Sequence, residues 1–319
     1  MMANDVVIGI DTSNYTTSVA VLTLDGELVA NIKRPLPVKH GERGLRQSDA
    51  VFAHIKNMPG AMEEAREALG GRQPLAVGVS ERPRNKDGSY MPCFLSGVSI
   101  AEGIGASLGV PVYKFSHQCG HIMAALYSAG RDIPERFFAF HISGGTTELV
   151  VAEKRDMGFE CRTVGGTKDL NAGQIIDRIG VYMGMPFPAG KYMEEAALRN
   201  TACVPKKKPP TDGAYANLSG LENMAVALYE QTKDEALVAA FVFDYVGRAV
   251  EMMCDFARET EGDLPFVFAG GVMSNSILKD RLAKRLDASF AEPLLSADNA
   301  VGIAILAKNA YKCEKGIKD

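Results

Sequence analysis

The stretch HISGGTT, residues 141–147, decides the fold. It ends an apolar strand pattern at residues 137–142 and begins a second one at residues 147–153. A related stretch, IGIDTS at residues 8–13, lies between two apolar runs near the N-terminus. Both are turns of small and hydroxyl-bearing residues, in which backbone N–H groups can approach phosphate oxygens closely. We therefore predict a phosphate-binding turn in each half of the chain.

A third glycine-bearing turn is FAGGV at residues 268–272, where a strand leads into a helix. Glycines at such a point allow a nucleoside to lie flat against the backbone. Any one of the three turns can be purely structural. Their occurrence in this order, on a repeated frame, favours a nucleotide-binding site.

The pattern of elements around these turns is repeated. Strands are predicted at residues 6–10, 17–24, 27–33, 74–80, 110–114, 137–142, 147–153, 159–163 and 264–269. Helices are predicted at residues 48–69, 96–108, 120–129, 172–183, 192–199, 237–260, 274–286 and 299–311. A three-strand meander followed by helix–strand units thus occurs twice, which predicts an α/β fold of duplicated architecture. We place the first lobe at residues 1–115 plus 300–319 and the second at residues 116–299.

The composition of the 319 residues is ordinary: 46% are hydrophobic and the formal net charge is −4. The six cysteines form no CxxC pair, which argues against a disulfide framework and a structural zinc or iron–sulfur site. No stretch approaches the roughly 20 apolar residues of a membrane span, and the N-terminus has no signal-peptide pattern. We expect a cytoplasmic protein with no membrane partner. Contact with a nucleic acid would need a local basic patch, such as residues 206–208 or the arginines and lysine of residues 82–86.

His117 and His121 are spaced so that both lie on one face of a helix. Two neutral imidazoles in this arrangement can chelate a transition metal, although the pair can also be two unrelated polar residues. The residue after the first histidine is Gln118, which cannot act as the general base of a zinc protease. A further ligand is needed, and Asp298 is a candidate; its alternative role is a helix N-cap.

These motifs, in this order, resemble those of the tRNA N6-threonylcarbamoyladenosine transferase (TsaD) family, which older labels call glycoproteases. The wider resemblance is to the actin, hexokinase and heat-shock ATPase superfamily (ASKHA). It implies an actin-like, two-lobed fold in which each lobe is a mixed five-stranded sheet flanked by helices. It also implies one divalent metal ion, iron or zinc, held by His117, His121 and Asp298. The implied nucleotide-binding residues are His141, Ile142, Ser143, Gly144, Gly145, Asp177, Gly190 and Asn275.

The activity implied by the resemblance is transfer of a threonylcarbamoyl group from threonylcarbamoyl-AMP to the N6 of the tRNA adenosine next to the anticodon. The adenine nucleotide ligand would be this intermediate, AMP or ATP. The implied partners are tRNA, a related actin-like protein that contacts the helix at residues 48–69, and a small ATPase.

Several positions depart from the family pattern and indicate a divergent paralogue. The opening ETSCDET of the family is here DTSNYTT at residues 11–17, and its SGGHT is here SGGTT at residues 143–147. The alternative is therefore a non-catalytic, nucleotide-binding partner of a related actin-like protein. A kinase is disfavoured because His141 stands where kinases of the superfamily carry an aspartate. A protease has no recognisable nucleophile here. In structural terms alone, Asp177 can be a solvated charge, Gly190 a turn end and Asn275 a helix cap.

Overall fold

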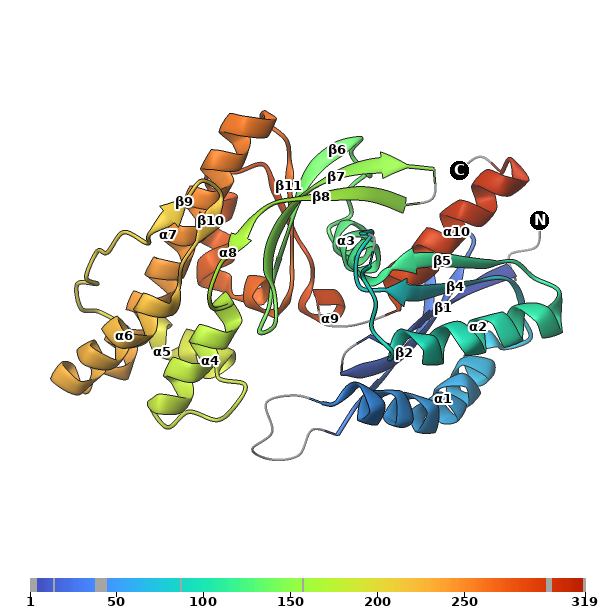
Figure 1. Ribbon diagram of the computed structural model, residues 1–319, viewed down its shortest axis with the longest axis horizontal. Helices are drawn as coiled ribbons and strands as arrows, with labels where there is room; N and C mark the ends of the chain where they lie inside the picture. Colours follow the sequence, from blue (N-terminus) through green and yellow to red (C-terminus); the bar gives the residue numbers. More distant parts are fainter. Residues whose placement is uncertain are drawn as a thin grey trace. The chain divides into compact units, whose positions relative to one another are not determined.

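The computed structural model describes residues 5–13, 15–37, 45–86, 88–156, 158–296 and 300–317 (Figure 1). The chain divides into two compact units. The first comprises residues 1–130, 154–160 and 297–319, and the second comprises residues 131–153 and 161–296. The contacts thus group the helix that begins at His117 with the first unit, whereas the boundary predicted from the sequence put it in the second lobe.

The first sheet has five strands, as predicted, in the order β3-β2-β1-β4-β5. β1 pairs antiparallel with β2 and parallel with β4, and β4 pairs parallel with β5. The meander predicted for the N-terminus is therefore confirmed. The strands are β1 (Asp5–Asp11), β2 (Thr16–Thr23), β3 (Leu28–Pro35), β4 (Gln73–Arg82) and β5 (Val112–Ser116).

Helices cover this sheet on both faces. Alternate side chains of β1, from Val6 to Ile10, join a buried cluster with the apolar faces of α1 (Gln47–Leu69) and α2 (Phe94–Leu108). On the other face, α10 (Val301–Lys315) lies directly against the strand backbones. A Cβ at Gly9 would stand 2.5 Å from the Ala300 carbonyl oxygen, so only glycine permits this approach.

Close packing also joins α10 to α3 (His117–Ser128). A Cβ at Gly302 would stand 1.8 Å from the carbonyl oxygen of Gly120. A Cβ at Gly120 would in turn meet the Ile303 side chain at 2.9 Å. Glycine at both positions therefore fixes the helix that carries the two histidines against the last helix of the chain.

The second sheet has seven strands, in the order β12-β11-β6-β7-β8-β10-β9, so the prediction of five was wrong here. Five of them repeat the connectivity and order of the first sheet; β10 and β9 extend the β8 edge by a short hairpin. These two strands have two residues each, too few for a period-2 pattern to reveal them. The strands are β6 (Arg136–Ile142), β7 (Thr147–Arg155), β8 (Gly158–Thr167), β9 (Thr211–Asp212), β10 (Tyr215–Ala216), β11 (Phe266–Ala269) and β12 (Ala288–Phe290).

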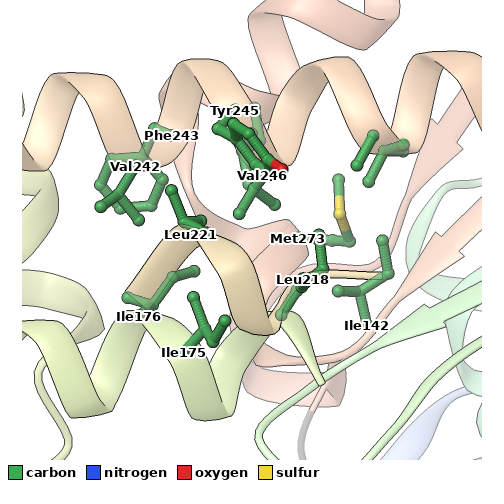
Figure 2. Close-up of a cluster of buried hydrophobic side chains, with 14 of the residues drawn as sticks. Ile142, Ile175, Ile176, Leu218, Leu221, Val242, Phe243, Tyr245, Val246 and Met273 are labelled. Atoms are coloured by element: carbon green, nitrogen blue, oxygen red, sulfur yellow. The ribbon is translucent and has the colours of Figure 1, made fainter. Parts of the chain in front are cut away.

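A large apolar core joins the second sheet to its helices. In Figure 2, Val242, Phe243 and Val246 of the long helix α7 face Ile175 and Ile176 of α4 across Leu221 of α6. The helices are α4 (Ala172–Tyr182), α5 (Gly190–Leu198), α6 (Ser219–Thr232), α7 (Glu235–Glu261), the 3-10 helix η1 (Gly271–Ser274), α8 (Ser276–Ala283) and α9 (Pro293–Ser296). Among the residues that the structure describes, no helix is long and apolar enough to cross a membrane.

Candidate metal and nucleotide sites

The two histidines of the predicted metal pair point at each other. Helix α3 begins at His117 because the Ser116 hydroxyl caps it, accepting the N–H of Cys119 at 3.2 Å. One turn later His121 is buried, and its Nε2 lies 2.8 Å from Nε2 of His117. The rings meet edge to face at 81°. The i, i+4 spacing noted in the sequence therefore brings the Nε2 atoms of His117 and His121 together on one face of α3.

Asp11 holds the first of these rings. Its Oδ2 lies 2.7 Å from His117 Nδ1, and its Oδ1 accepts hydrogen bonds from the Ser13 N–H and the Ser80 hydroxyl, both at 2.8 Å. The Asp11 side chain is buried, with 1% of the residue exposed. Asp11 belongs to the first glycine-bearing turn predicted from the sequence, but no role of its own was predicted for it. The feature that could have revealed this role is a carboxylate at the end of an apolar strand pattern.

The residues present fit a transition metal. An ionised carboxylate on Nδ1 accepts the proton there and leaves the Nε2 lone pair of His117 for a metal. Two nitrogens bound to one tetrahedral zinc ion lie roughly 3.4 Å apart, so a small ring rotation from 2.8 Å suffices. The third predicted ligand, Asp298, lies outside the described residues. Within the described ranges, no group of three or more histidine, cysteine or acidic side chains could hold a metal ion.

In the second unit, the turn between β6 and β7 is closed by its own polar groups. The Ser143 N–H donates to the Thr146 carbonyl at 2.7 Å, and the Thr146 N–H donates to the Ser143 hydroxyl at 3.1 Å. Gly144 and Gly145 are exposed, and a Cβ at either would meet no atom of the described residues within 4 Å. Neither has a positive φ. The protein itself therefore does not require glycine here, whereas a closely bound ligand would.

Two further segments approach this turn within the second unit. Helix α4 begins against it: the Gly173 N–H donates to the Ser143 carbonyl at 3.2 Å, and a Cβ at Gly173 would stand 2.6 Å from the Gly144 nitrogen. The glycine turn after β11 also lies against it, since a Cβ at Gly270 would stand 2.3 Å from the Ile142 carbonyl oxygen. The second and third glycine turns predicted from sequence are therefore neighbours.

Asp177 and Gly190 are brought together. The Asp177 carboxylate accepts the Ala189 N–H at 2.8 Å and also bonds the Gly190 N–H, which fixes the start of α5. Burial raises the pKa of Asp177, and these two N–H groups partly oppose that rise. Asp177 is therefore not simply a solvated charge, because its carboxylate accepts hydrogen bonds from N–H groups at the start of α5.

Asn275 caps a helix. Its side-chain oxygen accepts the Leu278 N–H at 3.0 Å at the start of α8, and the residue is buried. Helix α8 is joined to α5 by Ser276, whose N–H donates to Glu194 at 2.7 Å. The alternative role considered for Asn275, a helix cap, is therefore one that it fulfils, and its amide nitrogen bonds no other described residue.

The relatives of this chain decide its family. A model of the family described as TsaD, tRNA N6-adenosine threonylcarbamoyltransferase, matches residues 39–305. A tRNA N6-adenosine threonylcarbamoyltransferase of Streptococcus suis is 30% identical over 329 residues, which cover 98% of this chain and 95% of the relative. The chain belongs to the TsaD family. The family resemblance inferred from the motifs is thereby confirmed.

Solved structures agree on the fold. The activator of the 2-hydroxyisocaproyl-CoA dehydratase from Clostridium difficile, with bound ADPNP, is 14% identical and superimposes with a TM-score of 0.53 over 98% of both chains. The phosphate- and nucleotide-bound form of HypF is 12% identical with a TM-score of 0.61, covering 99% of this chain and 56% of that one. The actin-like fold of two mixed sheets expected for this TsaD-family chain is confirmed.

Proposed function

We propose that this TsaD-family chain transfers the threonylcarbamoyl group from threonylcarbamoyl-AMP to N6 of the tRNA adenosine next to the anticodon. The observation that carries the proposal is the pair of histidine Nε2 atoms 2.8 Å apart, with His117 oriented by a buried carboxylate. A pair held in this way is what a metal-assisted transfer needs, whereas a purely structural pair would need no carboxylate partner on the ring. Membership of the family supplies the reaction class.

In this proposal the second unit binds the nucleotide. The turn of His141, Ile142, Ser143, Gly144 and Gly145 holds the phosphate through the backbone N–H groups of Gly144 and Gly145, since the Ser143 N–H already donates to the Thr146 carbonyl. The two open glycines leave room for close approach. Asp177 and Gly190 bind the ribose, and the Asn275 amide nitrogen contacts the nucleoside. The hydrogen bonds of Asp177 and Asn275 give each side chain one fixed orientation.

The reaction forms one bond and breaks one. The N6 nitrogen of adenosine bonds to the carbamoyl carbon, the bond from that carbon to the phosphate oxygen breaks, and AMP leaves with the electron pair. The proton that the amine loses passes to solvent water. Iron or zinc held by His117, His121 and Asp298 would supply a Lewis acid for the carbamoyl or phosphate oxygen. The chain itself contributes positioning and stabilisation of phosphate charge by the turn at residues 141–145.

Metal analysis of the purified protein tests this proposal. We expect one equivalent of iron or zinc in the wild type and its loss in His117→Ala, His121→Ala and Asp298→Ala. Tyr127→Phe on the same helix is a matched control that should keep the metal. Tyr127 lies at the end of α3 away from His117, and its hydroxyl donates to the Gly26 carbonyl at 3.2 Å. A wild type that takes up neither metal on reconstitution would overturn the metal-dependent reaction.

A second candidate is a non-catalytic, nucleotide-binding partner of a related actin-like protein, and the surface of α1 favours it. Phe52 and Ile55 are 70% and 56% exposed. Further along the helix, a groove of about 310 Å³ lies between α1 and α2, lined by Met62, Leu69, Ile104 and Leu108. Nucleotide binding without transfer, together with a complex that Phe52→Glu disrupts, would favour this candidate over the transferase.

A further inference from the structure

We infer that Asp11 and Ser80 are positioning residues that fix the tautomer of His117 and thereby direct its Nε2 at the metal. The inference deepens the proposed function and rests on its metal site. It concerns two residues that the ligand set of His117, His121 and Asp298 does not include. Asp11 ends β1 and Ser80 lies near the end of β4, so the orienting groups stand on the sheet rather than on a loop.

The sheet register places the two residues together. β1 and β4 are parallel, with Ile10 opposite Val79, so that Asp11 and Ser80 follow side by side at the carboxyl ends of their strands. Ser80 is fully buried and donates its hydroxyl proton to Asp11 Oδ1. The same oxygen accepts the backbone N–H of Ser13. Two donors on Oδ1 therefore leave Oδ2 turned toward His117, at 2.7 Å.

The Ser13 N–H determines which atom of residue 11 faces it and which faces His117. A backbone N–H can only donate, so the atom of residue 11 that faces it has to be an acceptor. The atom at the other position faces His117 Nδ1. When it is a carboxylate oxygen, Nδ1 carries the proton and Nε2 has a lone pair. That lone pair points toward Nε2 of His121, where the two imidazoles converge.

The isosteric variant Asp11→Asn tests the assignment. Its carbonyl oxygen has to face the Ser13 N–H, which places the NH₂ group against His117 Nδ1. Nδ1 then becomes the acceptor and the proton moves to Nε2, which removes the lone pair from the metal position. We expect the ¹⁵N chemical shifts of metal-free protein, above the imidazole's usual pKa, to show an Nδ1–H tautomer of His117 in the wild type. In Asp11→Asn they should show Nε2–H.

Zinc affinity, measured by competition with a chromophoric chelator, gives the second readout. Loss of an outer carboxylate partner typically weakens metal binding by about 10- to 100-fold, and we expect a loss in that range for Asp11→Asn. Ser80→Ala keeps the carboxylate and removes one of its donors, so it should weaken zinc binding by a smaller factor. Asp169→Asn is the matched control. Asp169 also accepts three N–H groups, from Leu170, Leu218 and Ser219, but in the second unit, so its replacement should leave zinc affinity unchanged.

The outcomes separate this inference from the proposed function. An unchanged His117 tautomer in Asp11→Asn, or zinc affinity equal to wild type in both Asp11→Asn and Ser80→Ala, would overturn the positioning role. If the wild type binds neither zinc nor iron but the His117 tautomer still differs between the wild type and Asp11→Asn, the metal proposal is overturned. That result would nevertheless support Asp11 as the group that orients His117. If Asp11→Asn does not fold, the Ser80→Ala affinity decides: a loss supports the inference, and no loss contradicts it.

Discussion

The turn after β1 and the turn after β6 occupy equivalent places in two sheets of the same strand order, but their residues are used differently. In the first turn the functional group is a side chain: the buried Asp11 carboxylate, held by Ser80, bonds His117. In the second turn no charged side chain is held in this way. Ser143 and Thr146 close the turn, and two exposed glycines leave open space beside the backbone.

The glycines near the two turns also differ in whether neighbouring protein atoms leave room for a side chain. Gly9, just before the first turn, is required by the protein itself, because α10 lies against it. At Gly144 and Gly145, by contrast, nothing in the described part of the chain lies close enough to require glycine. The two halves thus share a strand order, while one turn belongs to a network of side-chain hydrogen bonds and the other has open space beside its backbone. Substitutions that are matched between the two halves can test this difference.

The largest expected effect is on stability in the first half. Gly9→Ala places a methyl group 2.5 Å from the Ala300 carbonyl oxygen and 2.7 Å from the Ala304 nitrogen, both backbone atoms of the α10 region. We expect a loss of about 1–3 kcal/mol in the free energy of unfolding, measured by chemical denaturation. Gly103→Ala in α2, where a Cβ meets no atom of the residues that the structure describes within 4 Å, is the control and should be neutral or stabilising. Equal stability of both variants would contradict the packing argument.

In the second half we expect a glycine substitution to weaken nucleotide binding without lowering stability. Gly144→Ala should leave the free energy of unfolding unchanged or raise it by about 0.4–1 kcal/mol, since an open loop position loses unfolded-state entropy. Its affinity for AMP, measured by calorimetry, should fall by about tenfold, equivalent to about 1.4 kcal/mol. If Gly144→Ala binds AMP like the wild type, the turn does not hold the phosphate.

A smaller effect concerns the two basic clusters. Lys206, Lys207 and Lys208 are exposed, and none forms an ion pair with a described residue, whereas Arg82 lies 3.5 Å from the Glu81 carboxylate. If the lysines contact tRNA phosphates, replacing all three by alanine should lower the salt dependence of log K by up to roughly 2–3 units of slope. Replacing Arg82, Arg84 and Lys86 instead should lower it less. A larger effect of the second set would reassign the tRNA contact to the first unit.

The smallest expected effect is the pH dependence caused by Asp177. Because its pKa in the folded protein is raised by burial, the folded state holds this proton more tightly than the unfolded state. Its contribution to stability is therefore lost as the pH rises from the ordinary aspartate pKa through the raised one. The free energy of unfolding of Asp177→Asn, relative to wild type, should increase over that window. A difference that stays flat with pH would show that Asp177 has an ordinary pKa.

Sequence patterns predicted most of the elements but not the contacts between distant residues. The strands on either side of both turns follow from apolar runs, and the pairing of His117 with His121 follows from helical spacing. Helix α6 was missed because its first N–H groups, from Leu218 and Ser219, bond the Asp169 carboxylate, 49 and 50 residues earlier in the chain. The role of Asp11 was missed for the same reason. Its partners Ser80 and His117 are 69 and 106 residues away, and the parallel pairings of β1 with β4 and of β4 with β5 bring the three together.

The most direct test of the account is transfer itself. Unmodified tRNA would be incubated with threonylcarbamoyl-AMP and the reconstituted protein, and its nucleosides analysed by mass spectrometry. The account predicts N6-threonylcarbamoyladenosine with the wild type, its loss with His121→Ala, and its retention with Tyr127→Phe. Absence of product from a wild type that holds its metal and binds AMP would contradict the transferase assignment and favour the non-catalytic partner.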